Sequence, residues 1–173
     1  YRQVLTQMLD QRVSDYLEVM HKKLKIPNGM EWCMSCFIAW YAIHFFPRRY
    51  LDIGAARGCS VPMVLGACTV TECNIIESWD AKNSGPFPDA SILSDLLHQI
   101  GFRGYLRFVM GDPSTSFNRL QVSLPSPMFF DLAVFRSDLF KDKKEIVRQL
   151  HHILNCLSAK GALLFCCRSK ALF

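Results

Sequence analysis

Apolar side chains recur along this chain with two periods, one typical of helices and one typical of strands. Over about residues 2–23 they repeat at helical spacing, which predicts an amphipathic N-terminal helix that ends before Pro27. We therefore expect residues 1–27 to form a helical extension and residues 28–173 to form the main domain.

Short apolar runs alternate with helical patterns five times in the main domain. The predicted strands lie at 49–53, 74–77, 105–110, 129–135 and 162–167. The predicted helices lie at 30–46, 60–67, 89–100, 113–121 and 141–157, and Gly161 is expected to end the last of them. This alternation predicts an α/β fold, with a parallel sheet, helices on both of its faces and right-handed crossovers.

A turn punctuated by glycines separates the first predicted strand from the helix that follows it. Residues 51–60 read LDIGAARGCS, and the helix is expected to begin at Ser60. A turn in this position presents backbone N–H groups to a small ligand at the carboxyl end of a strand, and glycines let ligand and backbone approach closely. The spacing does not match the G-x-G-x-x-G of dinucleotide-binding turns, and no P-loop Gly-Lys-Ser/Thr follows.

Three acidic residues, Asp52, Glu77 and Asp112, stand at or just beyond the ends of the first three predicted strands. In a doubly wound sheet these ends line one crevice. Glu77 is placed to accept both hydroxyl groups of a ribose, and Asp112 is placed to accept an exocyclic amine of a base. Taken singly, Asp52 and Asp112 are better explained as cap or turn residues. Taken together with the glycine turn, the three acids predict a ligand that contains a nucleoside.

Several motifs in succession resemble those of class I S-adenosylmethionine-dependent methyltransferases, in particular small-molecule O-methyltransferases. They are LDIGAARGCS, IIESWD, FVMGD and FDLAVFRSD, followed by a helix and AKGALLFCC, so the resemblance covers 28–167. It implies a Rossmann-like, doubly wound and mostly parallel sheet with strand order 3-2-1-4-5. It also implies S-adenosylmethionine as cofactor and a methyl acceptor that is a small molecule. The family has a glycine where this chain has Ala56.

The resemblance also implies which residues bind the cofactor. They are Asp52, Gly54, Ala55, Ala56, Gly58, Glu77, Trp79 and Asp112. The backbone of Gly54–Gly58 would hold the methionine part, Glu77 the ribose and Asp112 the adenine. Trp79 either stacks beside the adenosine or covers apolar surface.

The end of the fourth predicted strand departs from the family pattern. Many relatives carry a metal-binding acid there, whereas this chain has Arg136, followed by Ser137 and Asp138. Since an arginine cannot bind a cation, we expect no divalent-metal site. Arg136 either clamps a carboxylate or phosphate of the substrate or pairs with a neighbouring acid. Asp138 is either a general base or, preferably, the cap of the next helix. These two residues are the candidates for catalysis.

The family's sheet has seven strands, whereas this sequence predicts five. Strand 162–167 would then be an exposed edge. Three explanations stay open: a second copy, partner or neighbouring domain covers the edge, the chain is a fragment, or the fold is a reduced variant. A methyltransferase-like scaffold without turnover is therefore the alternative function, and a nucleotide-sugar or NAD-type enzyme is a third.

Composition narrows the class of protein without changing this picture. The chain has 173 residues, of which 50% are hydrophobic and 20% charged, which favours one globular domain. The net charge of +5 is spread along the chain, so there is no strong sign of nucleic-acid binding. The apolar stretch 30–46 is short for a membrane span and contains Glu31 and His44, so a core helix is expected.

Eight cysteines could indicate a secreted disulfide scaffold, but the chain is too long and too rich in aliphatic runs to need one. Since the sequence shows no signal peptide, we expect reduced thiols in a cytoplasmic protein. The stretch WCMSC at 32–36 has the spacing of a thioredoxin-like redox site, but no strand precedes it. We therefore interpret it as part of a helix.

Overall fold

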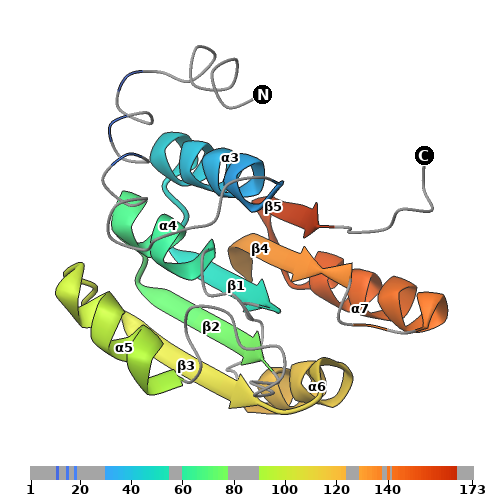
Figure 1. Ribbon diagram of the computed structural model, residues 1–173. Coiled ribbons are helices and arrows are strands. Elements are labelled where there is room, and N and C mark those ends of the chain that lie inside the picture. The colour runs from blue at the N-terminus through green and yellow to red at the C-terminus, as the bar shows by residue number, and fades with distance from the viewer. Residues whose placement is uncertain are drawn as a thin grey trace.

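The computed structural model describes residues 30–54, 60–77, 90–123, 129–137, 140 and 142–166, together with residues 11, 15 and 18. In this part of the chain a five-stranded parallel sheet lies between two layers of helices (Figure 1). The strands are β1 Arg49–Ile53, β2 Glu72–Glu77, β3 Tyr105–Met110, β4 Phe130–Arg136 and β5 Leu157–Cys166. The helices are α3 Met30–Phe45, α4 Ser60–Ala67, α5 Ala90–Gln99, α6 Pro113–Ser123 and α7 Lys143–Asn155.

The strands lie in the order β3-β2-β1-β4-β5, which confirms both the predicted α/β class and the predicted order. The central strands β1 and β4 are buried along almost their whole length. Helices on both faces of a parallel sheet leave no side of its central strands open to water, so such strands are continuous apolar runs. The run predicted at 129–135 has this character because it is β4.

Alternate residues of β1 face different cores. Tyr50 belongs to the core under α3, α4 and α5, and Leu51 belongs to the core under α6 and α7. Because side chains alternate along a strand, Asp52 points to the same face as Tyr50. The functional consequence is that a buried carboxylate lies between the central strand and helix α4.

The last helix and strand differ from the prediction. Helix α7 ends at Asn155, and β5 begins at Leu157 instead of residue 162. Gly161 therefore does not end the helix; it lies inside β5, beside a shift in the register with β4. A Cβ atom at Gly161 would stand 2.7 Å from the carbonyl oxygen of Phe130. Glycine is required here because the two backbones approach each other closely.

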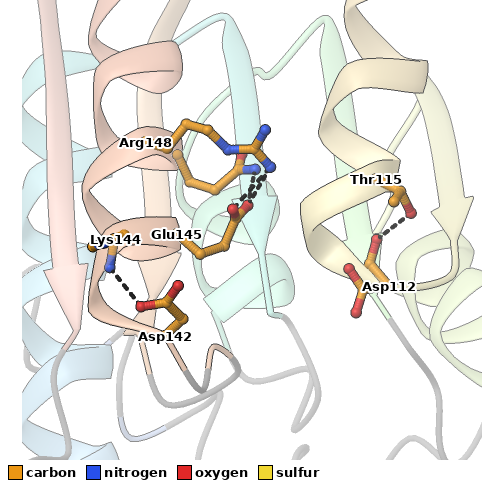
Figure 2. Close-up of polar contacts among 7 residues, drawn as sticks. Asp112, Thr115, Asp142, Lys144, Glu145 and Arg148 are labelled. Carbon is orange, nitrogen blue, oxygen red and sulfur yellow. Dashed lines mark hydrogen bonds and ion pairs between the residues drawn. The ribbon is translucent and has the colours of Figure 1, made fainter.

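The cap of α7 also differs from the prediction. Asp142, not Asp138, occupies the N-cap, and its Oδ1 accepts a hydrogen bond of 2.9 Å from the backbone N–H of Lys144 (Figure 2). The preferred interpretation of Asp138 as the cap of this helix is therefore wrong. Asp138 itself lies outside the described residues.

A single carboxylate joins three strands at the amino-terminal edge of the sheet. Asp131 of β4 accepts hydrogen bonds at Oδ2 from the backbone N–H groups of Arg48 (3.0 Å) and Arg49 (3.1 Å). Its Oδ1 accepts a hydrogen bond of 3.0 Å from the hydroxyl of Ser158 in β5. Asp131 thus fixes the starts of β1 and β5 relative to β4.

Helix α3 is 16 residues long and packs on the sheet through Ile38, Ala39 and Ala42, as expected of a core helix. The WCMSC stretch lies within it, which confirms the helical interpretation. No helix in the described ranges is long and apolar enough to cross a membrane. Five cysteines are present as thiols rather than in disulfides: Cys36, Cys68, Cys73, Cys156 and Cys166.

The predicted N-terminal extension lies mostly outside the described residues. Gln11, Asp15 and Glu18 are helical and exposed, and Gln11 Nε2 donates a hydrogen bond of 2.7 Å to Asp15 Oδ1. The boundary near residue 27 stays a prediction. Among the described strands, β5 forms one edge of the sheet and leaves Phe165 45% exposed.

Replacing Asp131 is expected to loosen the amino-terminal edge of the sheet. The change Asp131→Ala removes the acceptor of three hydrogen bonds and should lower the free energy of unfolding by about 2 kcal/mol, measured by urea denaturation. Asp95→Ala, at an exposed position of α5, is the matched control and should leave stability unchanged within error. Equal stability of the two variants would contradict the proposed clamp.

Candidate functional site

The carboxyl ends of β1, β2 and β3 lie side by side. Ile53 pairs with Ile76, and Glu77 pairs with Met110. Beyond these pairs the N–H of Gly54 donates to the carbonyl oxygen of Ile76 over 3.0 Å, and the N–H of Gly111 donates to that of Glu77 over 3.1 Å. The turns that follow β1 and β3 are therefore both anchored to the end of β2.

Gly54 begins the turn after β1. It is buried and has φ +94°, a left-handed conformation that other residues adopt only with strain. The turn therefore requires glycine at this position. Ala55, Ala56 and Gly58 lie outside the described residues, and so does Trp79, so their predicted roles stay predictions.

Asp52 joins the strand before the turn to the helix after it. Its side chain is fully buried, and Oδ2 accepts hydrogen bonds from the Tyr50 hydroxyl and the Ser60 hydroxyl, each 2.5 Å long. Hydrogen bonds from a hydroxyl to a carboxylate are charge-assisted and stronger than those between neutral groups. Since Ser60 is the first residue of α4, the carboxylate holds both ends of the glycine turn.

Burial raises the pKa of Asp52 above its usual value, because the charged form loses its hydration. The hydrogen bonds from Ser60 and Tyr50 and the positive charge of Arg136 act in the opposite direction and offset only part of this effect. Burial, with the nearby charge of Asp52, also holds the pKa of Tyr50 well above its usual value. The Tyr50 hydroxyl therefore remains a hydrogen-bond donor over the physiological pH range.

The second oxygen of Asp52 is a buried acceptor whose hydrogen-bonding capacity is not used. In the described part of the chain, Asp52 Oδ1 is buried and accepts no hydrogen bond. A buried acceptor without a donor is costly. A ligand that brings a donor, such as an ammonium group, to this oxygen would remove that cost.

Glu77 and Asp112 occupy the positions that the sequence predicted, in different environments. Glu77 ends β2 and is 1% exposed. Asp112 is exposed, and its carbonyl oxygen accepts bonds from the N–H groups of Thr115 (3.1 Å) and Ser116 (2.9 Å) and from the Thr115 hydroxyl (Figure 2). The backbone of Asp112 thus starts α6, as the cap interpretation predicts.

Arg136 ends β4, on the other side of β1 from Glu77. It is only 8% exposed, and its charge acts on Asp52. The next residue, Ser137, donates a hydrogen bond of 3.2 Å from its hydroxyl to the carbonyl oxygen of Cys166 and so ties β4 to β5. Within the described ranges, no three His, Cys, Asp or Glu side chains group as metal ligands would.

The structure thus brings Asp52, Gly54 and Glu77 to one edge of the sheet. The sequence-based reasoning missed Tyr50 and Ser60 as partners of Asp52. One signal was available, because residues two apart in a strand share a face, which places Tyr50 beside Asp52. The contact with Ser60 depends on the path of the turn and had no comparable signal.

The raised pKa of Asp52 gives a prediction for stability. The folded protein holds this proton more tightly than the unfolded chain does, so the stabilising contribution of Asp52 is complete below its unfolded pKa of 3.8 and is lost as pH rises through the folded pKa. Asp52→Asn removes this titration. The melting temperature of the variant minus that of the wild type should therefore increase between about pH 4 and pH 7.

Thermal melting at a series of pH values measures this difference, with Asp95→Asn as the exposed control. A difference that stays constant over the series would show that Asp52 titrates alike in the folded and unfolded chains.

Comparison with known proteins shows similarity at the level of structure. No family model and no curated protein matches the sequence. The O-methyltransferase TomG from Streptomyces achromogenes, solved in complex with SAM, has a TM-score of 0.59 and 16% identity, over 91% of this chain and 65% of that one.

Two further solved structures carry S-adenosylhomocysteine (SAH). An O-methyltransferase from Bacillus cereus has a TM-score of 0.56 and 14% identity, over 87% of this chain and 63% of that one. The methyltransferase PaMTH1 from Podospora anserina has a TM-score of 0.55 and 16% identity, over 91% and 62%. This chain therefore spans less than two thirds of these three proteins, and it has the Rossmann-like fold of O-methyltransferases.

Proposed function

We propose that this chain binds S-adenosylmethionine and transfers its methyl group to a small-molecule acceptor. One observation carries the proposal: the buried carboxylate of Asp52 and the left-handed Gly54 frame the turn after β1, beside the buried Glu77 at the end of β2. Solved O-methyltransferases with the same fold and with SAM or SAH bound support it.

The described residues fit this cofactor. The unsatisfied Oδ1 of Asp52 suits a donor such as the ammonium group of the methionine part. The acidic side chains Asp52 and Glu77 also favour a cationic ligand, and the sulfonium of the cofactor is a cation. A nucleotide with several phosphates would instead be repelled by these carboxylates.

Each predicted residue takes a role in this proposal. The backbone of Gly54–Gly58 holds the methionine part, with the small side chain of Ala56 in place of the family's glycine. Glu77 accepts the two ribose hydroxyls, and Asp112 lies near the adenine amine. Trp79 stacks beside the adenosine.

Methyl transfer requires mainly that the protein align the methyl donor with the acceptor. When bound, S-adenosylmethionine supplies a methyl group whose bond to sulfur breaks with the electron pair left on sulfur, while the acceptor heteroatom takes the methyl and gives its proton to water. Holding the two reactants in line lowers the activation barrier by roughly several kcal/mol. Asp52, Glu77 and the turn do this by orienting the cofactor, and Asp138 is the candidate base for an acceptor of low acidity.

The competing function is a binding module with this fold and without turnover. Ala56 in place of the family's glycine and Arg136 at the end of β4 favour it. Titration calorimetry with S-adenosylmethionine and SAH separates the two. Tighter binding of SAH, the product, supports an enzyme, and no binding at about millimolar cofactor supports the module. A cytoplasmic location and a second copy or partner domain that covers β5 remain predictions.

The glycine turn is tested by a pair of glycine variants. Gly54→Ala forces an alanine into φ +94° at the site and should weaken SAH binding by about tenfold or more. Gly101→Ala is the matched control, because Gly101 has φ +85° at the end of α5 and a Cβ there would meet no atom within 4 Å. Calorimetry should find its SAH affinity unchanged; equal losses in both variants would exclude a ligand-binding turn.

The ribose contact is tested on the two ends of β2. Glu77→Gln keeps the size of the side chain but loses the charge that accepts two hydroxyls, so SAH affinity should fall by about tenfold or more. Glu72→Gln, at the first residue of the same strand, should bind SAH as the wild type does. An unaltered dissociation constant in the Glu77 variant would remove Glu77 from the site.

A further inference from the structure

The last residues of the strands include an acid, a base and neutral side chains. The last residues of the five described strands are Ile53, Glu77, Met110, Arg136 and Cys166. Arg136 is therefore the one basic residue that ends a strand in the described sheet. The acids lie on β1, on β2 and just beyond β3, whereas the arginine lies on β4, which flanks β1 on its other side. The charge of this sheet edge thus changes sign across β1.

Register places Arg136 next to the glycine turn. Val134 pairs with Asp52, and Phe135 pairs with Ile53, which is the last pair between β1 and β4. Arg136 follows directly, at the level of Gly54. Because it lies two residues beyond Val134, it points to the same face of the sheet as Asp52.

Burying the guanidinium of Arg136 costs free energy unless anions lie close to it. Arg136 is 8% exposed, and the charge of Asp52 lies close enough for the two groups to interact. Asp52 already accepts two short hydroxyl bonds at Oδ2. A guanidinium presents five N–H donors in a planar fork, which serves more than one anion and binds carboxylate or phosphate oxygens in pairs. Arg136 therefore suits a role in which it faces Asp52 and a ligand anion together.

We propose that Arg136 determines acceptor specificity by binding an anionic group, a carboxylate or a phosphate, of the methyl acceptor at the carboxyl end of β4. This inference rests on the proposed function, because it takes the nucleoside part of the cofactor to lie over β2 and β3. The cationic cofactor then lies on the acidic side of β1, and the anionic acceptor lies on the side of Arg136. The two ligands meet at β1, where their opposite charges also favour each other.

The test measures binding of matched small probes by calorimetry, with and without saturating SAH. Salicylate and its neutral amide, salicylamide, report on a carboxylate, and phenyl phosphate and phenol report on a phosphate. The wild type should prefer the anion of at least one pair by about tenfold or more, and Arg136→Met should abolish this preference in the titrations without SAH. Arg136→Lys, which keeps the charge but not the fork, should retain part of the preference.

Controls separate this role from a role in folding. Arg103→Met, at an exposed position before β3, should keep the wild-type preference. Arg136→Gln replaces the methionine variant should that one fail to fold, and circular dichroism checks both.

Three results would overturn the proposal. In the first, the wild type shows no preference for either anion. In the second, the preference survives in the Met and Gln variants. In the third, these variants lose affinity for SAH but not for methylthioadenosine, which lacks the amino acid part, so that Arg136 holds the cofactor's own carboxylate. Failure of SAH to bind the wild type would instead reject the proposed function, and the titrations without SAH would still report on Arg136.

Discussion

The buried carboxylate of Asp52 is the constraint on which this site depends. A charge removed from water is tolerated only where donors and opposite charges replace its hydration. Here the replacements come from three places in the chain: Tyr50 on the same strand, Ser60 at the start of α4 and Arg136 at the end of β4. Satisfying one buried charge therefore ties the end of β1 to the start of α4, and these two ends flank the segment that we propose binds the cofactor.

The order of the strands places groups of opposite charge on the two sides of β1. Because β1 lies between β2 and β4, the same turn has Glu77 on one side and Arg136 on the other. In the proposed function the sugar and the cation of the cofactor lie on the first side, and an anionic acceptor lies on the second. The fold shared with O-methyltransferases is compatible with many acceptors. We propose that the charges at the strand ends, which belong to this chain's own residues, restrict that choice.

The accuracy of the sequence-based predictions follows the strength of the local signals. The bounds of β1, β3 and α4 agree with the predictions because apolar runs and turn residues mark them clearly. The start of β5 was missed because Ser158 and Lys160 are polar and interrupt the pattern. Pairing with β4 makes that segment a strand, and the hydroxyl of Ser158 bonds to Asp131. The role of Gly161 was also missed, because the backbone that lies close to it is that of Phe130, which is far away in the sequence.

The sequence by itself determined the alternation of strands and helices, the glycine turn and the acids at the strand ends, because these depend on residues near one another in the chain. Only the tertiary structure decided what those acids touch. Asp52 bonds to Ser60 and lies near the charge of Arg136 because parallel pairing brings residues far apart in sequence to one edge of the sheet. Local patterns contain no information about such contacts, since hydrogen bonds and burial depend on distances in space.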